Sequence, residues 1–215
     1  MHRAHSVMFD RPKTMLPARR AVIIKNDNVT SGPVDTTTRL ADEGSRLKKD
    51  GQMHAMIVPP MDRTLGSLSK ILTIAEAHCT AKNIKPEALL NFRLFPDMLP
   101  FTKQVQLACD FAARCCARLA GESPQSFADT ETTFAELQAR IAAARAYMAS
   151  FPHSAYDGAA TREITFKAGP MDMTLPGAGF LISYATPQFH FHCTTAYNIL
   201  RHNGVEIGKR DYMGA

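Results

Sequence analysis

Three polar residues near the C-terminus, Gln188, His192 and Thr195, follow one another at intervals of four and three. On a helix this spacing places their side chains on one face, which also carries the apolar residues Leu181 and Ile199. The polar side chains are therefore expected to point into a core, where an unsatisfied polar group costs roughly 1–3 kcal/mol. In such a layer, His192 has the chemistry of a metal ligand or of a general acid or base near neutral pH.

A fourth polar residue, Gln104, falls on the inward stripe of an earlier segment, between Phe101 and Ala108. We expect Gln104 to be the hydrogen-bond partner of this layer. Two interpretations stay open. Either Gln104, Gln188, His192 and Thr195 line a small-molecule pocket, or they form a polar core network that only fixes how the helices pack.

A different secondary structure for the histidine segment would change which residues meet. If residues 188–193 formed a strand, Gln188, His190 and His192 would share one face. On a helix, His190 and His192 differ by about 200° and point apart. We favour the helix because the stripe continues without a break through residues 195–202.

Four amphipathic helices and a hairpin are predicted to position these residues. Thr133 and Glu136 form the pattern of a capping box, Gly121 closes the preceding helix, and Pro187 is expected to kink or divide the last one. The helices are predicted over about residues 60–83, 100–119, 134–151 and 179–203, with a short helical piece after Pro86 and a hairpin formed by residues 163–166 and 171–175.

Charge and turn residues divide the chain at about residue 52. Residues 1–52 lack a sustained period and hold ten Lys or Arg against six Asp or Glu, whereas residues 53–215 hold fifteen against fourteen. We interpret residues 1–52 as a disordered basic extension, or as sequence upstream of the true translation start, since Met53 directly precedes the first organised segment. The bundle domain is expected over residues 53–215.

Composition also excludes several classes of function. The predicted domain has a net charge near zero and no basic stripe, which argues against nucleic acid as a partner. No apolar run approaches the roughly 20 residues of a membrane span, so no membrane partner is expected and a cytoplasmic location is predicted. Five cysteines, an odd number without a C-x-x-C pair, indicate reduced and buried thiols.

Several segments resemble an uncharacterised bacterial and fungal domain family of the DinB/YfiT-like superfamily. They are Leu94–Pro100, Gln104–Phe111, Asp129–Leu137 and Pro187–Gly204. The resemblance covers nearly all of residues 53–215. It implies an all-α, up-down four-helix bundle with a small hairpin before the last helix, often assembled as a homodimer.

The resemblance also implies a site. Better-studied relatives hold a divalent metal with three histidines, and some are thiol-dependent transferases or isomerases. His192 matches the final ligand, whereas Gln188 and Gln104 (or Gln106) stand in place of the other two histidines. An amide oxygen is a much weaker ligand than imidazole for zinc or nickel. His78, Asp110 or His190 would restore a metal site only if the fold brings them to His192.

Two functions from different classes follow. The first is a degenerate relative of the metal-dependent transferases and isomerases, with a small-molecule pocket around His192. The second is a non-catalytic dimeric bundle whose glutamine and histidine layer is structural or binds a ligand without turnover.

Overall fold

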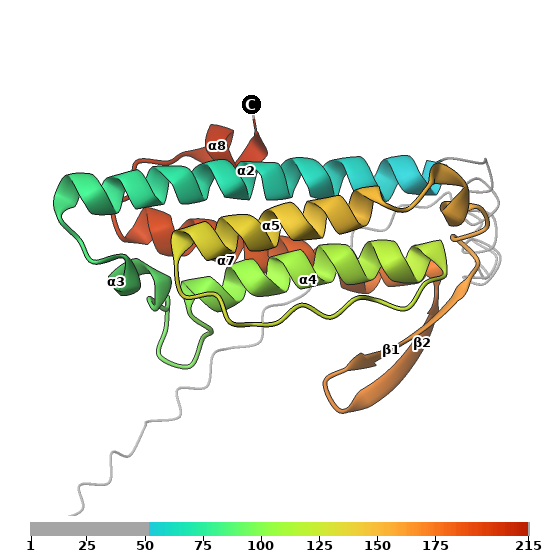
Figure 1. Ribbon diagram of the computed structural model, residues 1–215. Helices are drawn as coiled ribbons and strands as arrows, with labels where there is room; N and C mark the ends of the chain where they lie inside the picture. Colours follow the sequence, from blue (N-terminus) through green and yellow to red (C-terminus); the bar gives the residue numbers. More distant parts are fainter. Residues whose placement is uncertain (1–51, 215) are drawn as a thin grey trace, which may run out of the picture. The chain divides into compact units, whose positions relative to one another are not determined.

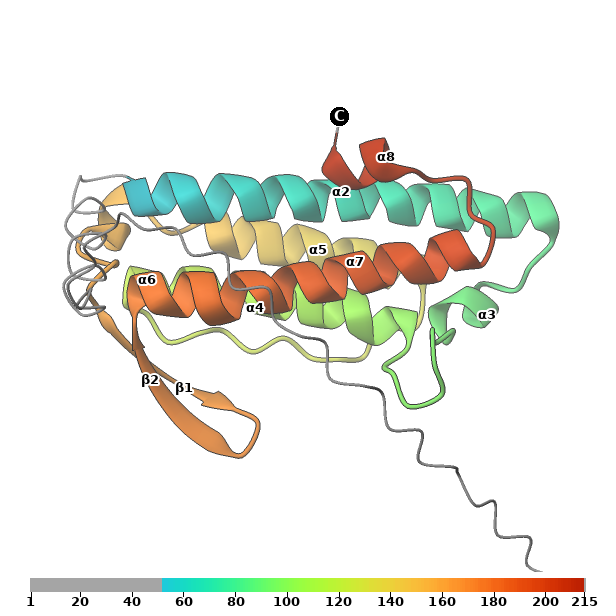
Figure 2. The ribbon, with the colours of Figure 1, turned by 180° about the vertical axis from the view of Figure 1, so that it is seen from behind.

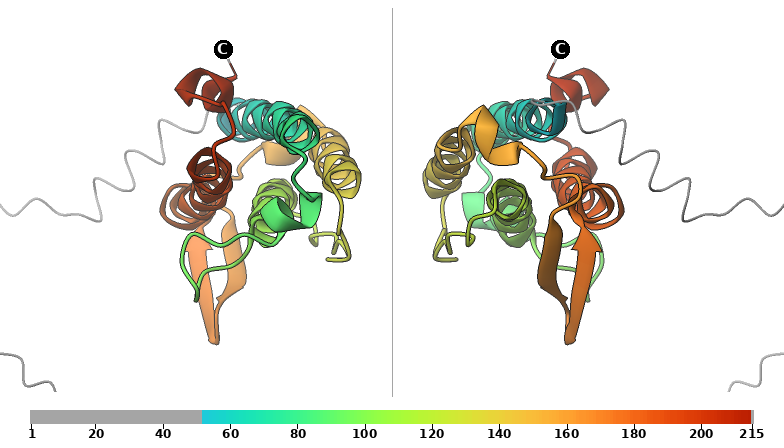
Figure 3. Two further views of the ribbon diagram at one scale, coloured as in Figure 1. Left: turned by 90° about the vertical axis from the view of Figure 1, so that its left-hand side faces the viewer. Right: turned by 90° about the vertical axis from the view of Figure 1, so that its right-hand side faces the viewer.

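The computed structural model describes residues 52–214, which fold into a bundle of four long helices (Figure 1). These are α2 (Gln52–Lys82), α4 (Phe101–Ala120), α5 (Phe134–Ala149) and α7 (Thr186–His202). The end-on views show the four helices around one centre, with α4 between α5 and α7 (Figure 3). The predicted four-helix bundle is confirmed. Residues 1–51, most of the predicted basic extension, lie outside the described residues.

Shorter elements close the bundle and connect its helices. A 3₁₀ turn follows α5, and an antiparallel hairpin pairs Glu163 with Pro176 and Ala168 with Met171, which confirms the predicted hairpin. Figure 2 shows the hairpin leaving the bundle beside the start of the last long helix. The bounds of the shorter elements are α3 (Pro86–Leu90), η1 (His153–Tyr156), β1 (Glu163–Ala168), β2 (Met171–Pro176), α6 (Gly177–Phe180), η2 (Leu181–Ala185) and α8 (Lys209–Met213).

Helix α2 begins eight residues earlier than the prediction of about residue 60. It runs through Pro59 and Pro60, which remove two backbone donors and would normally end a helix. Both prolines face solvent, while Met53, Ile57 and Met61, at intervals of four, are buried. Burial of this apolar stripe therefore outweighs the helix-breaking effect of the prolines.

Two helix ends follow their sequence signals. Gly121 closes α4 with a left-handed φ of 84°, and its amide donates to the carbonyls of Ala117 and Arg118. At the start of α5, the Thr133 side chain accepts from the Glu136 amide, and the Glu136 carboxylate accepts from the Thr133 amide. The predicted capping box is confirmed.

Helices α4 and α5 run in the same direction, because the connection over residues 121–133 travels back along the bundle (Figure 1). Polar contacts hold this connection in place. The buried Arg140 of α5 donates to the Ala128 carbonyl and to Glu131, and Lys103 of α4 pairs with Asp129 at 2.9 Å. A long return loop is thus fixed to both helices that it joins.

The last helical stretch passes Pro187 without a break. A short α-helical turn, α6, leads into the π-helical turn η2 and then directly into α7, with helical dihedral angles at Phe180, Ala185 and Thr186. A π-turn just before a proline accommodates the backbone carbonyl that loses its donor. The expected break at Pro187 is therefore absent. The helix instead changes from α-helical to π-helical pitch just before the proline and then continues.

The core is apolar and contains all five cysteines. Every cysteine is a buried free thiol, as predicted. Burial raises the pKa of Cys109 and Cys116 to about 12, which makes them inert small hydrophobes rather than nucleophiles. None of the helices between residues 52 and 214 is long and apolar enough to span a membrane.

Candidate functional site

The structure brings His192 of α7 and Gln104 of α4 together inside the bundle. The Nδ1 atom of His192 lies 2.7 Å from Oε1 of Gln104, and both residues are buried. At its other end, the Gln104 Nε2 atom donates to the Leu99 carbonyl at 3.1 Å. The predicted pairing of the two inward stripes is therefore present, and a backbone carbonyl just before α4 extends it.

This chain of hydrogen bonds determines the tautomer of His192. Because Gln104 donates through Nε2, its Oε1 atom faces the imidazole, and an amide oxygen only accepts. Nδ1 of His192 must therefore carry the proton and donate it. In the neutral ring, Nε2 then holds the free lone pair, and no residue between 52 and 214 forms a hydrogen bond with it.

Burial keeps this imidazole neutral. Desolvation lowers the pKa of His192 to about 4, because the charged ring would lose its hydration inside the bundle. Gln104 offers only a neutral amide oxygen, which does not compensate for the lost hydration as a carboxylate would. At pH 7 His192 is therefore an uncharged hydrogen-bond acceptor at Nε2.

Aromatic side chains enclose the ring. Phe111 of α4 stacks on His192 with centroids 5.4 Å apart and an interplanar angle of 11°. Phe191 meets the ring edge-on at 5.3 Å. Phe111 also contacts Tyr184, at 6.0 Å. The side chains of Phe111 and Phe191 thus separate most of the imidazole from solvent.

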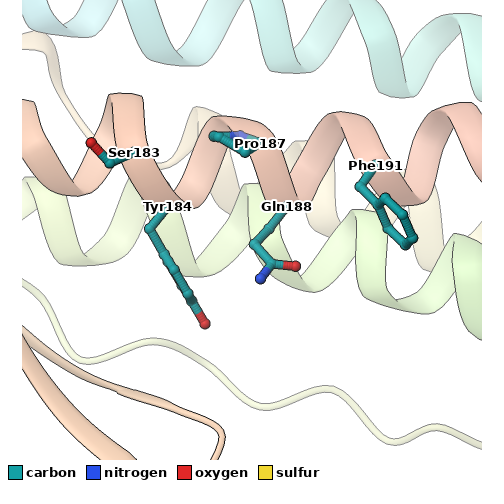
Figure 4. A pocket seen from close by; sticks show the side chains of 5 residues that line it. All are labelled: Ser183, Tyr184, Pro187, Gln188 and Phe191. Carbon is teal, nitrogen blue, oxygen red and sulfur yellow. The ribbon is translucent and has the colours of Figure 1, made fainter. Parts of the chain in front are cut away.

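A pocket of about 250 Å³ lies along η2 and the first part of α7, and its lining includes Phe191, the neighbour of the His192 ring, but not His192 itself. Tyr184, Gln188 and Phe191 occur at intervals of four and three and project to the same side of the helix (Figure 4). Ser183 and Pro187 complete the lining. Gln188 is partly buried and stands one turn before His192, so the pocket lies on the same side of the helix as the imidazole.

The other predicted pocket residue, Thr195, has a local role. Its hydroxyl donates to the carbonyl of Phe191 one turn earlier, at 2.7 Å. This bond turns the side chain back onto its own helix rather than toward Gln104 or His192. Of the four residues predicted to form one layer, only Gln104 and His192 contact each other. Gln188 lines the pocket on α7, and Thr195 bonds to its own helix.

The residues present do not suit a divalent metal. Gln104 uses both ends of its amide, so its oxygen is engaged with His192 rather than free. Within residues 52–214, no three His, Cys, Asp or Glu side chains lie close enough to hold an ion. Two residues that were candidates to replace the missing histidines are used elsewhere, since His190 contacts Tyr212 and Asp110 pairs with Arg140 and Arg114.

A buried ionic network near this site was not predicted from the sequence. Arg140 donates to Asp110 at 2.5 Å and to Glu131 at 2.9 Å, and its guanidinium lies 4.7 Å from the Phe127 ring centroid. Glu131 also accepts from Gln106. Gln106, considered as a site residue, therefore belongs to this network. Only the three-dimensional path of residues 121–133 brings these groups together.

Comparison with known proteins identifies the family to which this bundle belongs. A family model described as "Domain of unknown function (DUF1993)" matches residues 53–213. A crystal structure of a DinB family member protein from Shewanella denitrificans is similar, with 40% sequence identity and a TM-score of 0.72, covering 77% of this chain and 94% of that chain. No curated protein matches the chain. The homodimer implied by the resemblance stays a prediction.

Proposed function

This chain belongs to the DUF1993 family within the DinB-like superfamily, and from that premise we propose that it binds a small molecule in the pocket along η2 and α7. The ligand occupies the pocket lined by Tyr184, Gln188 and Phe191 and presents a hydrogen-bond donor to Nε2 of His192. The hydrogen-bond chain from Leu99 through Gln104 to His192 carries this proposal, because it fixes the acceptor nitrogen in advance.

The nature of the acceptor supports binding more strongly than proton transfer. A general base works best when its pKa lies near the working pH. Burial holds the pKa of His192 at about 4, so at pH 7 the ring takes protons only from acidic donors. It accepts a hydrogen bond from an O–H, N–H or S–H group without losing its neutral form. Binding through a fixed acceptor therefore matches the site better than acid–base turnover.

The pocket has the composition of a binding site for a small, partly apolar molecule. The rings of Tyr184 and Phe191 offer apolar surface, while the Gln188 amide supplies both a donor and an acceptor. Phe191 is 55% exposed. A ligand that covered this ring would remove its apolar surface from water and gain binding free energy.

A fragment screen of the full chain by ligand-observed NMR tests this proposal. Fragments that combine an apolar ring with an O–H or N–H donor are expected to bind, and Phe191→Ala and Gln188→Ala are each expected to weaken binding several-fold. Phe95→Ala is a matched control, since Phe95 is also exposed but lies in the connection between α3 and α4. A screen without hits, or binding unaffected by Phe191→Ala, would overturn the proposal.

A further inference from the structure

The pocket along η2 and α7 contains a glutamine amide that has no hydrogen-bond partner among residues 52–214. This residue, Gln188, is partly buried, and its amide points into the pocket (Figure 4). The three glutamines of α4 and α5, by contrast, each donate a hydrogen bond through Nε2, to Leu99, Glu131 and Ser69. The Gln188 amide is therefore available to a ligand.

The lining of this pocket carries no charge. Its five described residues include no acidic or basic side chain, whereas the hollow beside the start of β1 is lined by two arginines and two glutamates. A charged group that enters a pocket without a counter-charge loses hydration and gains no ion pair in return. The pocket therefore favours a neutral molecule.

Aromatic rings stand before and after Gln188 along the helix. Tyr184, one turn earlier, is held in place by its neighbours, with its ring centroid 4.4 Å from that of Phe166 and 5.9 Å from that of Phe180. Phe191, three residues after Gln188, has an exposed ring that a ligand can cover. A flat molecule is able to lie with its face on such a ring while its edge reaches the neighbouring amide.

A glutamine amide recognises an edge that presents one donor and one acceptor side by side. Oε1 of Gln188 accepts and Nε2 donates, so a primary amide or a lactam pairs with it through two hydrogen bonds. Glutamine and asparagine side chains recognise the edge of adenine in DNA in this way. Rotation of the amide by 180° exchanges its donor and acceptor, so the pairing is possible in either orientation.

We infer that the molecule bound in this pocket is a neutral, planar amide or lactam, which pairs edge-on with the Gln188 amide while its ring covers Phe191. Its N–H donates to Oε1 of Gln188, and its carbonyl accepts from Nε2. This inference rests on the proposed function and adds the chemical class of the ligand. The donor that the ligand presents to His192 is a separate group, which the pairing with Gln188 does not require.

Two lactams that differ in one N–H group test the pairing on the full chain. The probes are 2-quinolone and N-methyl-2-quinolone, which share the flat ring and the carbonyl, and their binding is measured by NMR titration. The first is expected to bind about tenfold more tightly, because the methyl group removes one hydrogen bond and leaves Oε1 of Gln188 unpaired. Gln188→Ala should make the two affinities equal.

A change of one atom type in Gln188 should reverse a second preference. Benzamide offers a donor and an acceptor, whereas the similarly shaped benzamidine is a cation that offers only donors. The wild type should prefer benzamide. In Gln188→Glu the carboxylate only accepts, so this variant should prefer benzamidine. Asn198→Ala is a matched control, since Asn198 is an exposed amide on the same helix that does not line this pocket, and it should change neither preference.

The outcomes separate this inference from the proposed function. Equal binding of the two quinolones to the wild type, or a preference between them that survives in Gln188→Ala, would overturn the inference. So would a Gln188→Glu variant that still prefers benzamide. The proposed function survives these results if the fragment screen yields other molecules whose binding depends on Phe191. If that screen also fails, the proposed function is wrong as well.

Discussion

His192 on α7 and Gln104 on α4 are joined by a 2.7 Å hydrogen bond, and Gln104 is in turn anchored to the Leu99 carbonyl. The resemblance implies metal-binding histidines at position 188 and at position 104 or 106. In this chain an amide at position 104 instead orients the single imidazole. A site arranged in this way presents one oriented lone pair rather than a set of ligands, and this lone pair is the basis of the proposed binding function.

Removing the amide should destabilise the fold. Gln104→Leu leaves the buried Nδ1–H group of His192 without an acceptor, which should cost about 1–3 kcal/mol of unfolding free energy, measured by urea denaturation. Combining it with His192→Phe removes both polar partners and should recover part of that loss. Gln188→Ala serves as the control and should stay within about 0.5 kcal/mol of the wild type. If Gln104→Leu unfolded at the same urea concentration as the wild type, the Gln104–His192 hydrogen bond would contribute nothing to stability.

The stability of the protein should fall in mild acid. The pKa of His192 is about 4 in the folded protein and 6.5 in the unfolded chain, so between these values the unfolded state binds more protons. The contribution of neutral His192 to the free energy of unfolding is therefore fully present above pH 6.5. It is lost as the pH falls toward 4, by up to about 3 kcal/mol. Urea unfolding from pH 7 to pH 4 measures the loss.

A matched variant isolates the contribution of His192 to this pH dependence. His54 and His190 also have lowered pKa values and add loss of the same sign. His192→Asn keeps a donor near the position of Nδ1 but does not titrate, so its stability curve should be flatter than that of the wild type. Two parallel curves would mean that His192 is not held neutral by burial.

The ionic network around Arg140 should be far more important than a surface pair on the same helix. Arg140→Met leaves the mostly buried Glu131 without its cation and leaves Asp110 only its bond to the partly exposed Arg114, at a cost of about 3–5 kcal/mol. Arg145→Met breaks a half-exposed pair with Asp62 and should cost no more than about 1 kcal/mol. Thermal unfolding of the two variants compares them directly, and similar losses would contradict the assigned role.

Gly177 should tolerate no side chain. A Cβ atom there would lie 1.9 Å from the Ala159 carbonyl oxygen, so Gly177→Ala must displace the backbone before α6 and should cost about 1–3 kcal/mol. Gly179→Ala, two residues on, meets only Pro176 at 3.6 Å and should be neutral or slightly stabilising. Circular dichroism melts of both variants test the contrast, which would disappear if the turn before α6 were loose.

Periodicity and capping signals were sufficient to predict the four helices, the hairpin and the meeting of Gln104 with His192. The start of α2 was missed because local rules treat Pro59 and Pro60 as breaks, whereas burial of Ile57 decides the outcome. A helical wheel places Thr195 on the inward face but does not reveal that its hydroxyl bonds to its own helix. Local spacing thus predicts which face a residue occupies and not which partner it takes.

Contacts between distant segments lay beyond the sequence signals. From the sequence alone, Arg140 resembles an ordinary surface arginine. In the folded chain, the connection over residues 121–133 brings Glu131 to it. The different surroundings of Arg114, which pairs with Asp110, and of Arg118, which packs on Phe180, likewise depend on how α4 faces its neighbours. Long-range electrostatic complementarity has no period in the sequence, so it became visible only in the folded chain.

The hydrogen-bond chain from Leu99 through Gln104 predicts that His192 presents an unprotonated Nε2 at neutral pH. Long-range ¹H–¹⁵N correlation spectra of the histidine side chains at pH 7 test it directly, with His192→Asn identifying the signals of this ring. We expect Nδ1 to be protonated, Nε2 to have the shift of a free lone-pair nitrogen, and the ring to stay neutral down to about pH 5. A ring protonated at Nε2 with Nδ1 free, or one that titrates near pH 6.5, would contradict the claim.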